Sequence, residues 1–375
     1  MKVHITLVGA QPAPVYNGII ATNPDRVVFV YSEDSDGEVK AVMSEIDVEV
    51  DDQPPLSPTN PNEIVDRAKM LAEKYKNDEV TVNISSGLKS WSHLFARVFD
   101  PLPNATIVYM DQNNILWNYR TMQPQRGFVF DMDVQFRLMG NALKYYVPFS
   151  EYTSEDHVAM NTIMKARRYN FKSFNAMTAV LKKEWKNMVE TQKEGRYSFD
   201  ENNSLEWRKP DHVQLTLFSK KYGPAVFEVD SPHAFNLTFN SGWFEYKVAR
   251  MLSHWSNTRD IRMNCIFPPK RTPQKPKNEV DIVVDAGEKV LFVECKTQIE
   301  KSTDIDKFRT VVKNYGGMGS KALFVTDAIM SPMNKEKCVE SGILYFSLQD
   351  PIYGPNIEQA LFKVLDSKWF NINPK

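Results

Sequence analysis

The chain has 375 residues, which is more than one ordinary domain needs and predicts two or three domains. Hydrophobic residues make up 42% of it and charged residues 25%, a balance typical of a soluble globular protein and not of a disordered one. The formal net charge of −1 excludes a general coat for nucleic acids, so any surface that binds phosphate has to be a local patch.

The chain carries no apolar stretch long enough to span a bilayer, and its first nine residues have the pattern of a strand and not of a signal peptide. We therefore expect no membrane partner. Three cysteines do not suggest a disulfide framework, which favours a reducing cytoplasm. The six histidines are scattered without zinc spacing, so we expect ordinary surface or packing roles for them.

Residues 1–145 alternate the patterns of strands and helices. Residues 60–76 are typical of an amphipathic helix, with Asn60 as its cap and Pro61 in its first turn. Strands are expected at residues 4–9, 26–32, 79–84 and 105–110, with a further one at 115–119. Strands separated by helices predict a parallel sheet, and hence a Rossmann-like three-layer sandwich whose ligands lie at the carboxyl ends of the strands.

Two loops at these carboxyl ends are candidate ligand-binding segments, one after the strand at residues 4–9 and one after the strand at residues 79–84. Their candidate residues are Ala10, Gln11, Pro12, Asn83, Ser85, Ser86, Gly87 and Lys89. Backbone N–H groups at a strand-to-helix turn attract an anion, the helix N-terminus adds partial positive charge, and a lysine neutralises the ligand. Neither the GxxxxGK[ST] loop nor the GxGxxG fingerprint is present. The alternative is a turn in which the serines only cap the following helix.

Residues 146–235 are predicted to be a mainly helical connector. Residues 155–191 have a helical pattern that carries several lysines and arginines, which predicts solvated helices with their aromatic residues packed inward. Residues 202–210 resemble a turn-rich break, and residues 213–218 and 225–229 are candidates for a strand pair. We expect this region to couple the two ends of the chain.

The most informative segment lies in the C-terminal part, which we take as a third region over residues 236–375. Two short apolar runs flank a turn at residues 285–288, so the segment is typical of a β-hairpin. Side chains alternate across a strand, so Glu294 and Lys296 share one face while Cys295 points away, and Glu279 and Asp281 share a face of the partner strand.

Carboxylates and an ammonium group at one end of a hairpin are what metal-dependent phosphodiester hydrolysis requires. Carboxylate oxygens bind Mg²⁺ or Mn²⁺, and a lysine orients water or stabilises developing charge. The alternative is a surface hairpin with charges on its wet face. Residues 290–293 are apolar on both faces, however, and an ionic pair at the end of such an interior strand is costly without a function.

The neighbouring patterns extend this prediction. Residues 241–252 predict an amphipathic helix with Glu245 in its first turn, residues 303–313 predict a second helix, and residues 322–327 predict another strand. This order resembles the PD-(D/E)XK nuclease core, with Asp281 and Glu294-x-Lys296 as its motif. Val280 precedes Asp281 at the position where the family's motif has a proline. The resemblance implies an endonuclease in which Asp281, Glu294 and the Cys295 carbonyl bind the metal.

It further implies that Lys296 positions or activates the attacking water and that Glu245 is the additional glutamate of the family, which would hold a second metal ion, its water or the hairpin. The basic, proline-rich segment 267–277 is a candidate to hold the substrate backbone, with a stiff solvated loop as its alternative.

A Rossmann-like domain before such a core resembles the CARF-domain nucleases of type III CRISPR systems, and the Asn83-to-Lys89 turn matches their ligand loop with Ser86 in place of a glycine. This resemblance implies activation by cyclic oligoadenylate, with cyclic tetra-adenylate expected, a homodimer that shares one ring, and cleavage of RNA or DNA in antiviral defence. Two alternatives stay open: a restriction or repair endonuclease without nucleotide activation, and a ligand-responsive DNA-binding regulator.

Overall fold

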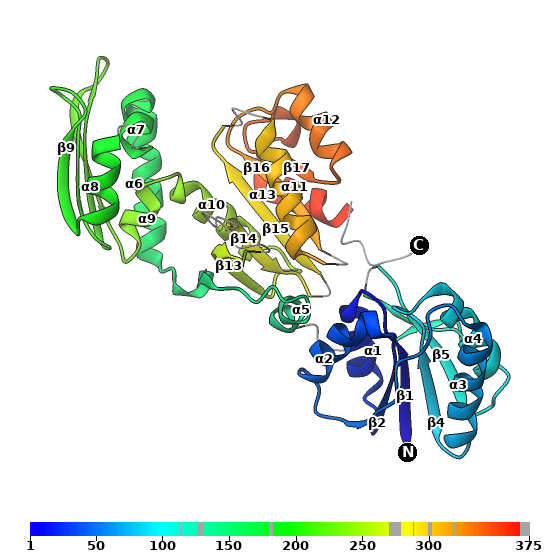
Figure 1. The fold of residues 1–375 in the computed structure, drawn as a ribbon. Coiled ribbons are helices and arrows are strands. Elements are labelled where there is room, and N and C mark those ends of the chain that lie inside the picture. Colours follow the sequence, from blue (N-terminus) through cyan, green and yellow to red (C-terminus); the bar gives the residue numbers. More distant parts are fainter. Residues whose placement is uncertain are drawn as a thin grey trace.

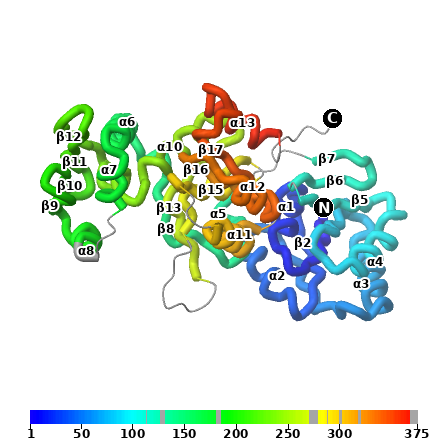
Figure 2. Tube along the Cα trace, turned by 90° about the horizontal axis from the view of Figure 1, so that it is seen from above, coloured from blue at the N-terminus to red at the C-terminus, as the bar shows by residue number. Residues whose placement is uncertain are grey.

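The computed structural model describes residues 1–112, 114–125, 131–179, 183–269, 279–287, 289–298, 302–317 and 320–367. Three parts follow one another along the chain (Figure 1). The part formed by the C-terminal strands lies between the N-terminal part and the middle part, as both ribbon and tube views show (Figure 2). The predicted basic segment falls largely on residues 270–278, which lie outside the described residues.

The N-terminal part is built on a seven-stranded sheet in the order β3-β2-β1-β4-β5-β6-β7, in which β1 to β5 run parallel and β6 and β7 antiparallel. Its strands are β1 Lys2–Leu7, β2 Arg26–Val30, β3 Glu49–Asp51, β4 Glu79–Asn83, β5 Ala105–Met110, β6 Leu116–Asn118 and β7 Gln123–Gln125. Its helices are α1 Pro12–Thr22, α2 Asp36–Met43, α3 Pro61–Lys74 and α4 Lys89–Phe99, with the short 3₁₀ turn η1 at Glu33–Ser35.

Separate apolar clusters cover the two faces of this sheet, as a three-layer sandwich requires. The Asn60 side chain caps α3 by accepting hydrogen bonds from the N–H groups of Asn62 and Glu63. The predicted Rossmann-like layout is thus confirmed, although the sequence did not predict α1, which begins at Pro12, a candidate residue of the first loop.

The middle part combines helices with an antiparallel sheet of order β12-β11-β10-β9. Its elements are α6 Ser154–Tyr169, α7 Phe171–Thr178, α8 Lys183–Thr191, β9 Glu194–Ser198, β10 Ser204–Arg208, β11 His212–Ser219, β12 Gly223–Asp230 and α9 Ala234–Thr238. The strand pair predicted at residues 213–218 and 225–229 is confirmed by β11 and β12, whereas the prediction of a mainly helical connector over residues 146–235 missed β9 and β10. Residues 202–210 include β10, whose alternation was hidden by the turn residues on either side of it.

The C-terminal part contains a six-stranded sheet of order β17-β16-β15-β14-β13-β8, parallel from β15 to β17 and antiparallel elsewhere. Its strands are β8 Tyr145–Pro148, β13 Asp260–Ile266, β14 Glu279–Asp285, β15 Val290–Lys296, β16 Lys321–Thr326 and β17 Leu344–Ser347. Its helices are α10 Gly242–Ser253, α11 Thr303–Tyr315, α12 Pro332–Glu340 and α13 Ile357–Leu365, with 3₁₀ turns η2 Phe149–Glu151 and η3 Pro351–Tyr353.

One apolar core runs through the middle sheet, the helices around it and one face of the C-terminal sheet. Trp207 of β10, Phe244 of α10 and Leu291 of β15 all belong to it. The middle part is therefore packed onto the C-terminal part as one continuous hydrophobic unit.

Helix α5, Met132–Leu138, joins this unit to the N-terminal part. Met132 and Phe136 pack into the core on the other face of the C-terminal sheet, whereas Val134 and Leu138 pack into a core of the N-terminal part. Residues four apart lie on one face of a helix, so α5 presents one apolar face to each side.

Polar contacts reinforce both sides of α5. Arg137 makes a bidentate ion pair with Glu45 of the N-terminal part, with nitrogen–oxygen distances of 2.7 and 2.8 Å. Asp133 pairs with Arg262 of β13, where Nη2 lies 2.8 Å from Oδ2 and the Arg262 side chain is only 9% exposed. Because α5 is built into both cores, a displacement of one part acts on the other through it.

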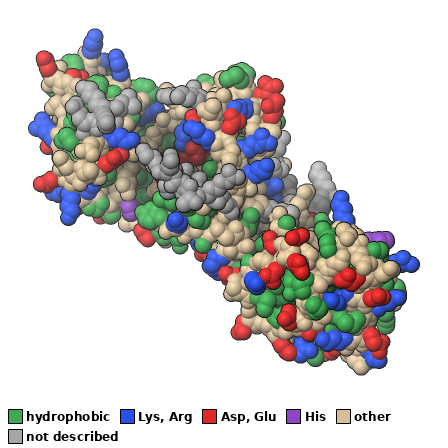
Figure 3. All heavy atoms as spheres, in the orientation of Figure 1, with side chains coloured by type: hydrophobic (Ala, Val, Ile, Leu, Met, Phe, Trp, Pro, Cys, Tyr) green, Lys and Arg blue, Asp and Glu red, His purple; other side chains and the backbone are tan. Residues whose placement is uncertain are grey.

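The surface shows no large field of one sign on the face drawn in Figure 3, where acidic and basic side chains are interspersed. Within the described part of the chain, no helix is both apolar enough and long enough to cross a bilayer. All three cysteines are free and buried.

Replacing Asp133 by alanine should lower the free energy of unfolding by about 1–2 kcal/mol, because the largely buried Arg262 guanidinium loses two charged hydrogen bonds and keeps the one to Asp260 and its stacking on Tyr146. Urea denaturation followed by circular dichroism measures this change. Asp36→Ala, which removes the exposed ion pair with Lys40, is the matched control and should stay within about 0.5 kcal/mol. Equal midpoints for the two variants would contradict the role given to Asp133.

Candidate functional site

The candidate catalytic residues converge at the end of the hairpin formed by β14 and β15. The paired positions run from Asp285 with Val290 to Ile282 with Val293, and Asp281 and Glu294 are the next residues on the two strands. There the Cys295 N–H donates to the Asp281 carboxylate over 2.6 Å. Both strands are apolar up to this point, so burial of the hairpin carries the two carboxylates into the protein.

Lys296 lies against both carboxylates. Its Nζ is 2.6 Å from Glu294 Oε1 and 3.7 Å from Asp281 Oδ2, and it donates to the Cys295 carbonyl over 3.3 Å. The Asp281 and Glu294 side chains are 13% and 16% exposed, whereas Lys296 is 36% exposed. One cation thus contacts all three oxygen donors that the sequence predicted for a metal ion.

Glu245 joins this group from the first turn of α10. Helix α10 forms as predicted, with Phe244, Val248 and Leu252 on its buried face. Burial raises the pKa of Glu245 well above its ordinary value, and the charges of Asp281 and Lys296 act on it in opposite directions. Glu245 is therefore electrostatically part of the hairpin site.

The other ionisable groups also differ from their values in water. Burial, followed by the nearby Asp281 charge, raises the pKa of Glu294 to about 7, and burial raises that of Asp281. Burial alone would lower the pKa of Lys296, but Asp281 and Glu294 more than offset it and raise that pKa. Three carboxylates around one ammonium leave an excess of negative charge, which a bound cation would relieve.

The two candidate ligand loops meet at the point in the N-terminal sheet where β1 lies between β2 and β4, so that the strand order reverses. Ligands of open α/β sheets bind at such a position. Ser86 joins the loops, since its hydroxyl donates to the Gln11 carbonyl over 2.7 Å and accepts from the Gly9 N–H over 3.2 Å. A Cβ on Gly87 would lie 2.4 Å from Leu7 Cβ, so only glycine permits this close approach.

The predicted loop residues divide into supporting and exposed groups. Asn83 is fully buried, accepts from the Ser85 N–H over 3.1 Å and donates to the Pro14 carbonyl over 3.2 Å. The Ser85 hydroxyl accepts from the Met110 N–H over 2.6 Å. These side chains, together with buried Pro12, shape the loops from inside.

The remaining predicted loop residues include exposed side chains that are available to contact a ligand. Ala10, Gln11 and Lys89 have exposed side chains, and Lys89 is the first residue of α4, where the helix N-terminus attracts anions. Lys89 forms no ion pair among the residues that the structure describes. Gln11 also lines a cavity of about 520 Å³ that reaches Arg309 and Lys313 of α11, so this loop borders the C-terminal part.

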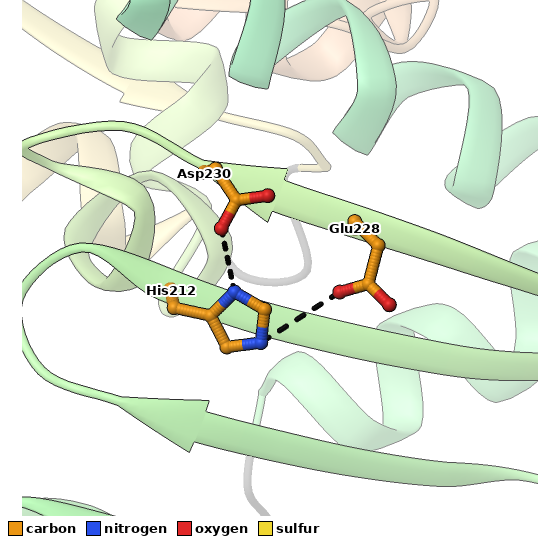
Figure 4. Close-up of side chains that lie close together, drawn as sticks. All are labelled: His212, Glu228 and Asp230. Atoms are coloured by element: carbon orange, nitrogen blue, oxygen red, sulfur yellow. Dashed lines mark hydrogen bonds and ion pairs between the residues drawn. The ribbon is translucent and has the colours of Figure 1, made fainter.

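A separate group of possible metal ligands lies on the middle sheet (Figure 4). His212 Nδ1 is 2.6 Å from Asp230 Oδ1, and its Nε2 is 3.6 Å from Glu228 Oε2. Asp230 and Glu228 are 68% and 49% exposed, so the group is a surface ion-pair cluster between β11 and β12. It agrees with the surface role expected for the histidines, and we assign it no part in the reaction.

No family model matches the chain, and no curated protein matches it. Solved structures do share its fold. Can2 from Sulfobacillus thermosulfidooxidans, in complex with cyclic tetra-adenylate, is 17% identical, with a TM-score of 0.66 over 99% of this chain and 100% of its own. Protein VC1899 from Vibrio cholerae is 14% identical, with a TM-score of 0.72 over 96% and 97%.

A third structure, described as a type III CRISPR defence DNA nuclease activated by cyclic oligoadenylate, is 17% identical with a TM-score of 0.58. It matches 98% of this chain but only 52% of its own length. These similarities confirm the expected fold class, an α/β chain in which an N-terminal Rossmann-like domain is followed by a second α/β domain.

Proposed function

We propose that this chain is a metal-dependent endonuclease of the PD-(D/E)XK type that cyclic oligoadenylate activates in type III CRISPR defence. The observation that carries the proposal is the convergence of Asp281, Glu294 and Lys296 within 3.7 Å at the end of one hairpin. The shared fold with Can2, whose structure holds cyclic tetra-adenylate, supports the same reading.

A divalent ion fits the donor set of the site. Carboxylate and carbonyl oxygens are the ligands that Mg²⁺ and Mn²⁺ prefer, and Asp281, Glu294 and the Cys295 carbonyl would hold the ion. When bound, the ion supplies Lewis-acid stabilisation of the phosphate and makes water a stronger nucleophile. Lys296 would position that water and stabilise developing negative charge, and Glu245, from the neighbouring helix, would hold a second ion, water or the hairpin.

The activator would bind at the loops after β1 and β4. Lys89 and the N-terminus of α4 suit the phosphates of a cyclic tetra-adenylate, and exposed Gln11 and Ala10 would form the other wall. Two chains would share one ring across a two-fold axis, as a homodimer. Helix α1 begins directly after Gln11, and its Asn17 accepts a hydrogen bond from Gln135 of α5 over 2.9 Å.

Helix α5 would therefore transmit binding to the nuclease site. It contacts α1 on one side and β13 on the other, and β13 pairs with β14, which carries Asp281. This route is a continuous chain of packed and hydrogen-bonded groups between the two sites.

A cleavage panel tests the proposal as a whole. RNA, single-stranded DNA and supercoiled plasmid are incubated with Mg²⁺ or Mn²⁺, with and without cyclic tetra-adenylate or cyclic hexa-adenylate. We expect cleavage only with both metal and activator. Strong cleavage without a nucleotide would favour a restriction or repair enzyme, and binding without cleavage would favour a regulator.

Glu294→Ala and Lys296→Ala should each lower the activated cleavage rate at least about 100-fold, because each removes a group that acts on the reacting phosphate or water. Cleavage is measured with purified protein in Mn²⁺. Isothermal titration with cyclic tetra-adenylate is the control and should give unchanged affinity. Wild-type cleavage by either variant would refute the catalytic assignment.

Saturating Mn²⁺ should raise the melting temperature of the wild type by about 2–5 °C, because an ion that binds only the folded state stabilises it. Asp281→Asn should lose this shift while keeping the acceptor for the Cys295 N–H. Glu228→Gln, in the surface cluster of the middle sheet, is the matched control and should keep it. The reverse pattern would move the metal site to the middle sheet.

Lys89→Glu should weaken cyclic tetra-adenylate binding by at least about tenfold and abolish activation, since it places a negative charge at a helix N-terminus that would receive phosphate. Unregulated hydrolysis, where measurable, should remain. Lys69→Glu, an exposed lysine of α3, is the matched control. Full activation of the Lys89 variant would place the ligand elsewhere.

A further inference from the structure

A pocket of about 290 Å³ opens directly beside the catalytic carboxylates. It lies between β8, α9, β13 and the start of α10, and Glu245 and Glu279 form part of its wall. The rest of its wall is aromatic, apolar or amide. Its polar or aromatic side chains include Tyr145, Asn236, Asn240 and Asn264.

Asn264 reaches the pocket from an irregular position in β13. Met263 pairs with Ile282 and Cys265 with Val280, so Asn264 is the residue opposite Asp281, and it has a positive φ of 52°. The pairing of β13 with β8 also shifts register between residues 263 and 266. Bulges of this kind occur next to active sites, where they redirect a side chain.

A second segment with left-handed backbone conformation forms the opposite wall of the pocket. Asn240 and Ser241 have φ values of 52° and 67°, and they lead into α10 just before Glu245. A Cβ on Gly242 would lie 2.0 Å from the Asn236 carbonyl oxygen, so the glycine lets α9 approach closely and sets Asn236 beside this turn. Strained backbone is thus present on both sides of one pocket.

The pocket offers hydrogen bonds that the protein does not use itself. The side-chain amides of Asn236, Asn240 and Asn264 form no hydrogen bond with any residue that the structure describes. Each amide carries both a donor and an acceptor. Tyr145 is 53% exposed at the first position of the edge strand β8, where its ring is free to stack.

The lining favours a flat, neutral, hydrogen-bonding group over a phosphate. None of the described residues that line the pocket is a lysine or an arginine, and two are carboxylates, which repel phosphate. The volume is near the lower end of the range for small-ligand sites, about 300–1,000 Å³. Amides that read base edges and aromatic rings that stack on base faces are the groups by which proteins hold nucleobases.

We propose that this pocket binds the base of the nucleotide next to the phosphate that is cleaved. A base inside a duplex is stacked and paired and cannot enter, so the pocket selects single-stranded nucleic acid or a nucleotide turned out of a duplex. This inference rests on the proposed nuclease function and adds the substrate class and a preference for certain bonds.

Binding tests the pocket independently of turnover. The Lys296→Ala protein is titrated, with Ca²⁺ present, against fluorescent single-stranded oligonucleotides in which one abasic nucleotide is moved along the strand, and binding is read by fluorescence anisotropy. In parallel, the activated wild type is given the same oligonucleotides, and each cut position is mapped. We expect the bond next to the abasic nucleotide to be cut about tenfold more slowly, and the intact strand to bind more tightly.

Two sets of variants keep the fold while changing the pocket. Tyr145→Ala should weaken binding of the intact strand about tenfold and remove its advantage over the abasic strand, whereas Tyr145→Phe should retain both. Asn240→Gly and Asn264→Gly remove the amides at positions where glycine tolerates the positive φ. Both variants should cut the bonds along the strand at more equal rates than the wild type does.

Tyr222→Ala, an exposed tyrosine of the middle sheet, and Asn23→Gly, another residue with positive φ, are the matched controls and should behave as the parent protein. An abasic nucleotide that changes neither binding nor cut positions, or pocket variants equal to their controls, would overturn the proposal. Failure of the nuclease function is seen separately: the wild type then cuts no substrate under any condition, whatever the binding results.

Discussion

The repulsion among buried carboxylates is the constraint on which the C-terminal part of this protein depends. Glu245, Asp281 and Glu294 are brought together by two apolar strands and an amphipathic helix, and among the described residues Lys296 is the cation that pairs with Asp281 and Glu294. Hydrophobic packing of the hairpin has to outweigh this repulsion, because charged groups in a partly buried site interact strongly. The same excess of negative charge makes the site suitable for a divalent cation, so the feature that costs stability also supplies the proposed chemistry.

In the ligand loops of the N-terminal part, by contrast, polar side chains are hydrogen-bonded within the protein, and a few others are left exposed to solvent. Asn83 and Ser85 bind neighbouring backbone groups and fix the loop, while Lys89 stays exposed at the helix N-terminus. The pocket beside Glu245 has a comparable division: strained turns fix the wall, and the cavity is lined by amides that have no hydrogen bond among the residues that the structure describes. In both places, fixed backbone presents a small number of groups that can bind a partner.

The proximity of the candidate catalytic residues could be predicted because strand alternation is a local rule that places Glu294 and Lys296 on one face and Asp281 opposite them. Glu245 followed from its place in the first turn of a clearly amphipathic helix. The bulge at Asn264 could not be predicted, because it depends on which strand pairs with β13, and this pairing is not local. Helix α5 was also missed. It has only seven residues and is buried on opposite faces, so it lacks the single apolar stripe that identifies a helix from sequence.

The shared core of the middle and C-terminal parts limits how the molecule can change shape. Separate motion of the middle sheet would expose Trp207, Phe244 and their neighbours to water, at a high cost in hydrophobic free energy. The middle and C-terminal parts are therefore expected to move together. Any movement of the N-terminal part relative to this unit then involves α5, which packs into the cores on both sides, at the edge of the C-terminal sheet that ends in β8.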